Sequence, residues 1–400
     1  MIAGLDPYAT GWLDLLARWL HVIAAIAWIG SSFYFIALDN HLLPPRRQGA
    51  ADEGVGGESW EVHGGGFYRI EKYKVAPPTL PEPLHWFKWE AYTTWLSGFA
   101  LMVILYYANA RTYLIDPSVA DLTPAEAIAI SIGMIVAAWV VYDLLCRVLE
   151  RNDLLLAAAL LGFVTLSAWG ASQLFSGRAA YIQVGAMLGT MMAGNVLFVI
   201  IPAHWELVRA KQAGREPDPA PGIRAKQRSV HNNYLTLPVL LAMISNHFPF
   251  TYGHAHAWLI LVLLMVIGAW TRHFFNARHT GRVYWWIPVS SAVAIALVAI
   301  WIRPSSAPAT ASATVAFARV QPIVEQRCAF CHSAHPRSPD FTTAPQGIVF
   351  DTPAEIAARA SAIDQVAVQS KTMPLGNVTH MTDAERELLG AWISQGANTK

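Results

Sequence analysis

A succession of long apolar runs restricts the folds that this 400-residue chain can adopt. The runs lie at roughly 13–38, 91–109, 125–147, 154–176, 180–203, 235–252, 255–273 and 283–302. About 20 apolar residues in a helix span the hydrocarbon core of a bilayer, and a helix pairs its backbone polar groups internally. The runs therefore predict an all-α fold, a polytopic membrane helix bundle of about eight transmembrane helices.

The composition also indicates a membrane protein. Hydrophobic residues make up 54% of the chain and charged residues 14%, with a mean hydropathy of +0.35. Soluble domains carry about 25% charged residues. The net charge is only +1 and the chain has no strongly basic stretch, which argues against nucleic acid as a partner.

Near the C-terminus, Cys328-Ala329-Phe330-Cys331-His332 forms a CxxCH motif, the signature of covalent c-type haem attachment. Each thiol can add to one haem vinyl group, and His332 is placed to ligate the iron. A thioether is the usual second axial ligand, and Met373 is the preferred candidate. Met381 is the alternative, but it lies at the start of an expected helix. The motif predicts haem c and one-electron chemistry.

Residues 315–400 have the layout of a small α-helical cytochrome c domain, with a helix before the motif and another at the end. Thr382 and Glu385 form the capping-box pattern that opens the last helix. A segment rich in Pro, Ser, Ala and Thr at 304–314 is typical of a linker. The chain thus divides into a membrane domain, 1–303, a linker and a cytochrome domain.

Basic residues gather in alternate loops of the membrane domain. The loops after the first, third, fifth and seventh expected helices carry most of the Lys and Arg, and the others carry few. The positive-inside rule places the basic loops in the cytoplasm and both termini in the periplasm. Because covalent haem attachment in bacteria is periplasmic, we expect a multi-pass protein of the bacterial inner (plasma) membrane with a periplasmic cytochrome domain.

Histidines inside membrane helices are functional candidates. His21 lies about a third of the way into the first run, and His247 lies in the outer half of the sixth. Histidines on facing helices can ligate haem b, so these two are candidate haem b ligands. For each one alone, the alternative is a hydrogen-bonded histidine between helices. His231 falls at the cytoplasmic end of the sixth helix.

The loop 39–90 is unusually long, and loops of this length are commonly functional or disordered. Residues alternate on both sides of a glycine turn at 64–66, which predicts a β-hairpin. His63, Arg69 and Lys72 lie within it, among aromatic residues. Cations, aromatic faces and glycine amides together are suited to binding a flat anion.

Several segments together resemble one family. They are Trp19-Leu20-His21 through Phe33, Trp60 to Tyr68, His85 to Gly98, and His231-Asn232-Asn233-Tyr234 through His247. With the CxxCH domain, the chain resembles the bacterial membrane-bound urate oxidases (urate hydroxylases) that carry a fused C-terminal cytochrome c. The start of the first helix is also similar to that of membrane protoporphyrinogen oxidases and related membrane haem proteins.

The resemblance implies that urate is hydroxylated to 5-hydroxyisourate and that its electrons pass to haem c rather than to dioxygen. A soluble cytochrome c or a terminal oxidase would take them onward. The urate site would be cytoplasmic, with Arg69 or Lys72 neutralising the anion and His63 or His231 acting as a base. A haem b would then relay electrons across about 30 Å of hydrocarbon.

Two other functions remain open from the sequence. A respiratory subunit that oxidises quinol would have the same histidine layers but no urate activity. A passive anchor for the cytochrome needs far fewer helices than this chain has. We therefore rank urate oxidation first, quinol oxidation second and anchoring last.

Overall fold

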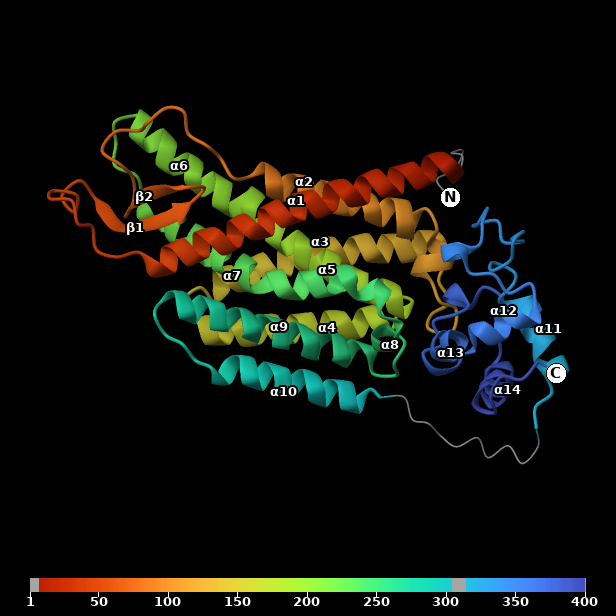
Figure 1. The fold of residues 1–400 in the computed structure, drawn as a ribbon. Helices are drawn as coiled ribbons and strands as arrows, with labels where there is room; N and C mark the ends of the chain where they lie inside the picture. Colours follow the sequence, from red (N-terminus) through yellow and green to blue (C-terminus); the bar gives the residue numbers. More distant parts are fainter. Residues whose placement is uncertain (1–6, 304–313, 400) are drawn as a thin grey trace.

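In the computed structural model, which describes residues 7–303 and 314–399, a long bundle of helices carries a small helical domain at one end and a β-hairpin at the other (Figure 1). Helix α1 (Pro7–His41) begins near the small domain and runs to the hairpin end. The described chain is mostly helical, which confirms the all-α prediction. Five of the described helices are long and apolar enough to cross a membrane, and α10 (Trp286–Trp301) is apolar but shorter.

The remaining bundle elements cover the expected runs, and several extend beyond them. They are α2 (Trp89–Leu101), η1 (Met102–Tyr107), η2 (Ala110–Leu114), α3 (Pro124–Val148), α4 (Asp153–Ser172), α5 (Gly177–Asn195), η3 (Val196–Ile200), α6 (Ile201–Gln212), α7 (Pro219–Ile244), η4 (Ser245–His247), α8 (Pro249–Tyr252) and α9 (Ala257–His279). Helices α5, η3 and α6 form one continuous span, Gly177–Gln212.

The sixth run is where the structure differs from the prediction. Helix α7 begins at Pro219, well before residue 235, because the Asp218 side chain caps it by accepting a hydrogen bond from Ala220 N. The helix ends at Ile244 rather than at 252. The following residues form the short turns η4 and α8, where Pro249 occupies the first turn of α8.

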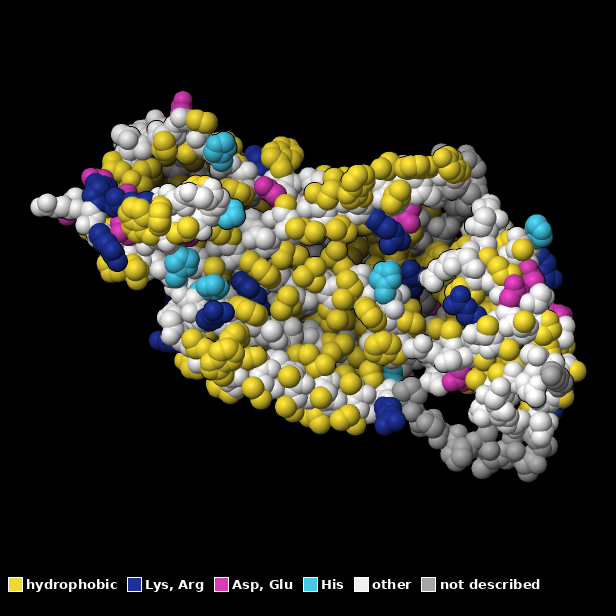
Figure 2. All heavy atoms as spheres, viewed as in Figure 1, with side chains coloured by type: hydrophobic (Ala, Val, Ile, Leu, Met, Phe, Trp, Pro, Cys, Tyr) yellow, Lys and Arg dark blue, Asp and Glu magenta, His cyan; other side chains and the backbone are white. Residues whose placement is uncertain are grey.

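The bundle is apolar on the outside as well as inside. Helix α5 has more buried residues than any other described helix, whereas Val136, Leu166 and Leu297 on other helices are exposed. Figure 2 shows hydrophobic side chains covering the flank between the two ends. Soluble proteins rarely expose apolar surface this extensively. A lipid environment removes the cost of this exposure, so the fold is that of a membrane protein.

The hairpin consists of β1 (Val55–His63) and β2 (Gly66–Tyr73), paired antiparallel, with His63 opposite Gly66. Gly64 and Gly65 both have positive φ, as a two-residue turn of this kind requires. The alternating pattern thus corresponds to a real hairpin. Tyr34 of α1 donates a hydrogen bond to Glu61 of β1 and ties the hairpin to the bundle.

The C-terminal domain has its own hydrophobic core. It contains α11 (Phe317–Arg327), η5 (Pro345–Gly347), α12 (Pro353–Ala358), α13 (Ala360–Ile363), η6 (Asp364–Gln369), η7 (Leu375–Asn377) and α14 (Asp383–Ser394). Trp392 is fully buried and stacks obliquely on Phe317. Thr382 and Glu385 form the expected capping box. The proposed linker, 304–314, lies outside the described residues except for Thr314.

Candidate functional site

The CxxCH motif follows α11 directly. Cys328 and Cys331 are unpaired thiols. Burial raises the pKa of Cys328 to about 12, so its thiol stays protonated near neutral pH. The His332 Nδ1 lies 3.1 Å from Ile348 O, which leaves Nε2 available, and burial lowers the pKa of His332 and favours the neutral ring that a metal needs.

Met373 and Met381 differ in their surroundings. Met381 is only 3% exposed and belongs to the domain core, whereas Met373 is partly buried beside that core. The Met373 segment is held in place by its own N–H, which donates to Val366 O at 2.9 Å, and by Arg386 Nη1, which donates to Met373 O at 2.7 Å. A held but incompletely buried thioether suits an axial ligand better than a core side chain does.

These residues fit a covalent haem: two free thiols, an imidazole with one free nitrogen and a partly buried thioether within one small domain. No group of three or more His, Cys, Asp or Glu side chains in 7–303 or 314–399 could hold a bare metal ion. A haem does not require such a group, because the porphyrin supplies four of the iron ligands.

Within the bundle, the structure brings His21 and His247 to one cavity of about 550 Å³, here called the histidine cavity. Its walls are mainly apolar and come from α1, α2, η1, α5 and α7. Asn246 also lines it, and its side-chain oxygen is buried with no hydrogen-bond partner among the described residues. A water or a bound group in the cavity would satisfy this buried polar atom.

His21 is oriented by helix α2. Its Nδ1 lies 3.0 Å from Thr94 O and 3.1 Å from Ser97 Oγ. These hydrogen bonds use only Nδ1, so they leave Nε2 available as a ligand atom. Gly98 makes this approach feasible, because a Cβ there would lie only 2.9 Å from His21 Cε1. The ring is therefore fixed in the way that second-shell hydrogen bonds fix metal-ligating histidines.

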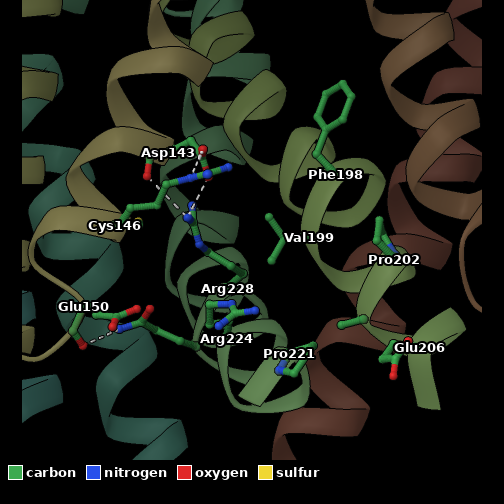
Figure 3. Close-up of a pocket in the computed structure, with 13 residues that line it drawn as sticks. Asp143, Cys146, Glu150, Phe198, Val199, Pro202, Glu206, Pro221, Arg224 and Arg228 are labelled. Carbon is green, nitrogen blue, oxygen red and sulfur yellow. Dashed lines mark hydrogen bonds and ion pairs between the residues drawn. The ribbon is translucent and has the colours of Figure 1, made fainter. Parts of the chain in front are cut away.

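A second cavity, of about 520 Å³, opens at the hairpin end and is here called the hairpin-end cavity (Figure 3). It lies between the end of α3, the η3–α6 segment and the start of α7. Its lining residues are Asp143, Cys146, Arg147, Glu150, Phe198, Val199, Pro202, Ala203, Glu206, Pro221, Arg224, Gln227 and Arg228. Arg224 forms no ion pair with any described residue.

Arg228 connects this cavity to a buried polar network. It is 4% exposed, donates to Asp143 Oδ1 at 2.8 Å and to Asn195 Oδ1 at 3.2 Å, and its guanidinium lies over the Tyr142 ring. Asn195 Nδ2 in turn donates to Tyr142 and to Asn232, both at 2.8 Å. These contacts satisfy a set of polar groups that would otherwise be costly to bury.

The network also reaches the histidine cavity. Asn232 Nδ2 donates to Met192 O at 3.0 Å, and Met192 lines that cavity. A hydrogen-bonded path therefore runs from Arg228 through Asn195 and Asn232 to Met192, from one cavity wall to the other.

The family model described as "Urate oxidase N-terminal" matches residues 7–303, the whole described bundle and hairpin. The chain belongs to the urate oxidase N-terminal family. Comparisons with curated proteins and with solved structures gave no significant match. The family assignment covers both cavities and ends where the membrane domain ends, before the CxxCH domain.

In this urate oxidase family member, the predicted hairpin cations already have acidic partners. Arg69 contacts Glu58 at 2.7 Å and Glu71 at 2.9 Å, and this pairing holds the pKa of Glu58 below its usual value. Lys72 contacts Asp39 at 2.5 Å. Both charges are thus compensated within the protein.

The two predicted base candidates are in different places. His63 ends β1 at the exposed hairpin tip, whereas His231 lies within α7, with Nδ1 2.9 Å from the Tyr142 hydroxyl and 3.8 Å from Cys146 Sγ. Cys146 lines the hairpin-end cavity, so His231 stands behind its wall. The structure brings His231 near this cavity, and none of the described contacts of His231 involves the hairpin.

Sequence reasoning did not identify Arg228, Asn195 or Tyr142, although polar residues in apolar helices were a usable signal. A further polar cluster, also missed, joins Arg272 and Asn276 of α9 to Asn233 of α7, each bond 2.9 Å long. Arg272 Nη2 is buried and has no hydrogen-bond partner among the described residues, and the guanidinium lies 3.7 Å from the centroid of the Phe33 ring. This cluster adds a positive charge inside the bundle, between α7 and α9.

Proposed function

We propose that this protein oxidises urate at the hairpin-end cavity and delivers the electrons through the membrane domain to haem c. One observation carries the proposal: the urate oxidase family match covers the helices that surround both cavities, and the same chain continues into a CxxCH domain. A CxxCH domain in the same chain is suited to accept the electrons that urate oxidation releases.

The reaction balances with water as the oxygen source. Urate and one water give 5-hydroxyisourate, two protons and two electrons. A new C–O bond forms at C5 of the purine, one proton leaves the attacking water and one leaves the purine. The two electrons leave one at a time, because haem iron accepts electrons singly.

The hairpin-end cavity supplies groups suited to a planar anion. Arg224, which has no acidic partner among residues 7–303 and 314–399, can compensate the urate charge with directed N–H donors. Phe198 offers an aromatic face, and the Gln227 amide can both donate and accept at the purine edge. This assigns to Arg224 the role that the sequence had proposed for Arg69 or Lys72.

His231 is the base that we assign. Its position behind Cys146 and its hydrogen bond to Tyr142 place an imidazole beside the cavity wall, and a neutral imidazole can accept a proton. The Tyr142 hydroxyl also bonds Asn195, so its orientation is fixed by the buried network. His63 lies at the exposed hairpin tip and is not among the residues that line this cavity.

In the histidine cavity, His21 and His247 would hold a haem b, which when bound supplies a one-electron acceptor between the two ends. The α1 start and the CxxCH domain would face the periplasm, and the hairpin would face the cytoplasm, where urate arises. A soluble cytochrome c or a terminal oxidase would take the electrons onward.

The test is anaerobic reduction. Urate is added to the oxidised, detergent-purified protein, and the haem c absorbance band is followed with any b-type band. Reduction of both bands supports the proposal. Reduction by quinol but not by urate would overturn it in favour of a quinol-oxidising respiratory cytochrome.

Variants test the site assignment. Arg224→Gln should raise the urate KM by about 10- to 100-fold, the effect of losing a charged hydrogen bond. Arg151→Gln is the matched control, because Arg151 is exposed near the same end but lies outside the cavity lining. Equal KM values for the two variants would exclude this cavity as the urate site.

A further inference from the structure

The cytochrome domain touches the membrane domain through its methionine segment. Gly376 of η7 lies against the end of η2, so closely that a Cβ there would be 3.0 Å from Ile115 O and 3.1 Å from Arg111 O. Gly376 also has a φ of +55°, where L side chains are strained. The absence of a side chain at Gly376 therefore allows the cytochrome backbone to approach the membrane domain this closely.

Two further contacts lie beside the first. Thr112 Oγ1 of η2 donates to Asp340 Oδ2 of the cytochrome domain at 2.6 Å. Gly253, which follows α8, lies against the backbone of Ser370, where a Cβ would overlap Ser370. Backbone on backbone and a short hydrogen bond to a carboxylate are features of a defined interface rather than of a loose tether.

On the cytochrome side, all three anchors are close in sequence to the proposed haem ligands. Ser370 and Gly376 bracket Met373. Asp340 lies just beyond Ser338, whose N–H donates to Phe330 O within the CxxCH motif at 3.0 Å. The interface is therefore built from the two segments that would flank the haem.

On the membrane side, the contacts come from η2 and from the residue after α8, and both elements are close in sequence to residues that line the histidine cavity. Helix α8 follows His247 after one intervening residue, and η2 follows η1, whose Tyr106 lines the cavity. A direct protein connection between the cavity and the cytochrome domain thus passes through η2 and α8 to the Met373 segment.

We propose that the cytochrome domain is docked permanently in this orientation, and that the Ser370–Gly376 edge is the surface through which it receives electrons from the membrane domain. One electron crosses per event, with no bond made or broken. The opposite surface of the cytochrome domain then remains free for the onward acceptor. The electron-entry part of this inference rests on the proposed function, whereas the docking does not.

Docking is measured by cross-linking. Thr112→Cys and Asp340→Cys are introduced together with a protease site between residues 304 and 313, and the full-length holoprotein is treated with a short bis-maleimide and then cleaved. The membrane and cytochrome fragments should stay joined. Cys146 is buried and does not compete.

Gly376→Ala is compared with Gly347→Ala in this background. Both glycines have positive φ in the cytochrome domain, but a Cβ at Gly347 meets nothing within 4 Å. The strain from φ is therefore matched, and only Gly376→Ala overpacks the interface. We expect about tenfold less cross-link for Gly376→Ala, equivalent to about 1.4 kcal/mol, and no change for Gly347→Ala.

A second readout follows electron entry. In Gly376→Ala, haem c should be reduced more slowly by urate but at the parent rate by ascorbate, which reaches it from solution. Equal cross-linking in both variants would overturn docking. Cross-linking that depends on Gly376 with no urate reduction in any variant would uphold docking and overturn the urate function, so the two failures can be told apart. Less cross-link in Gly376→Ala with an unchanged rate of haem c reduction by urate would overturn the electron-entry role.

Discussion

Two arginines bond the same carboxylate at the hairpin end, and they offer a matched test of burial. Arg228 lies 2.8 Å from Asp143 Oδ1 and Arg147 lies 2.6 Å from Asp143 Oδ2. The Arg228 side chain is 5% exposed and the Arg147 side chain is 72% exposed. Distance alone predicts similar contributions to stability, whereas burial predicts very different ones.

Arg228→Met should lower the free energy of unfolding by about 3–5 kcal/mol, the cost of breaking a buried ion pair by removing one partner. The substitution leaves Asp143 with only its exposed partner and removes the donor to Asn195 Oδ1. Arg147→Met should cost at most about 1 kcal/mol, because water already screens that pair. Met replaces the aliphatic part of either side chain, which limits the loss of packing.

Unfolding in mixed detergent micelles, followed by circular dichroism as the denaturing detergent is increased, measures both variants. Asp143→Asn completes a double-mutant cycle and should recover part of the Arg228→Met loss, because the stranded carboxylate is gone. If the two arginine variants agree within about 0.5 kcal/mol, burial does not control this network and the reasoning is wrong.

Two further predictions concern the proposed haem sites. Gly98→Ala should lower the haem b content by about tenfold by displacing the His21 ring, while Gly133→Ala, where a Cβ meets nothing within 4 Å, should leave it unchanged; pyridine haemochrome spectra measure both, and equal contents would contradict the role of Gly98. Met373→Ala should change the haem c spectrum and lower its reduction potential with little loss of stability. Met381→Ala should instead cost about 2–5 kcal/mol of stability with the spectrum retained, and the reverse result would make Met381 the ligand.

The sixth apolar run shows that the hydrophobic pattern did not predict the bounds of α7. Its length and hydropathy indicated a helix at 235–252, but the helix starts at Pro219 because Asp218 caps it, and ends at Ile244. A cap is a local signal, and Asp218 before Pro219 was readable in the sequence. The early end is less readable, because Pro238 lies inside the helix without ending it while Pro249 does begin a new turn.

The hairpin cations show a different limit. The sequence placed Arg69 and Lys72 in an aromatic, glycine-rich hairpin, and the hairpin is there. Their availability to a ligand depended on residues elsewhere, Glu58 and Asp39, which only the folded chain brings against them. The cation that lines the hairpin-end cavity without an ion pair among the described residues is instead Arg224, in the second turn of α7, where no motif marks it.

By itself, the sequence determined the features that depend on neighbouring residues: the membrane-spanning helices, the hairpin alternation and the CxxCH spacing. Apolar length, period and covalent spacing are local properties, so they can be read along the chain. Only the tertiary structure decided that His21 and His247 share one cavity, that Arg228 but not Arg224 has an ion pair within the described part of the chain, and that Gly376 meets η2. These facts depend on which helix faces are packed together, and residues far apart in sequence meet only through that packing.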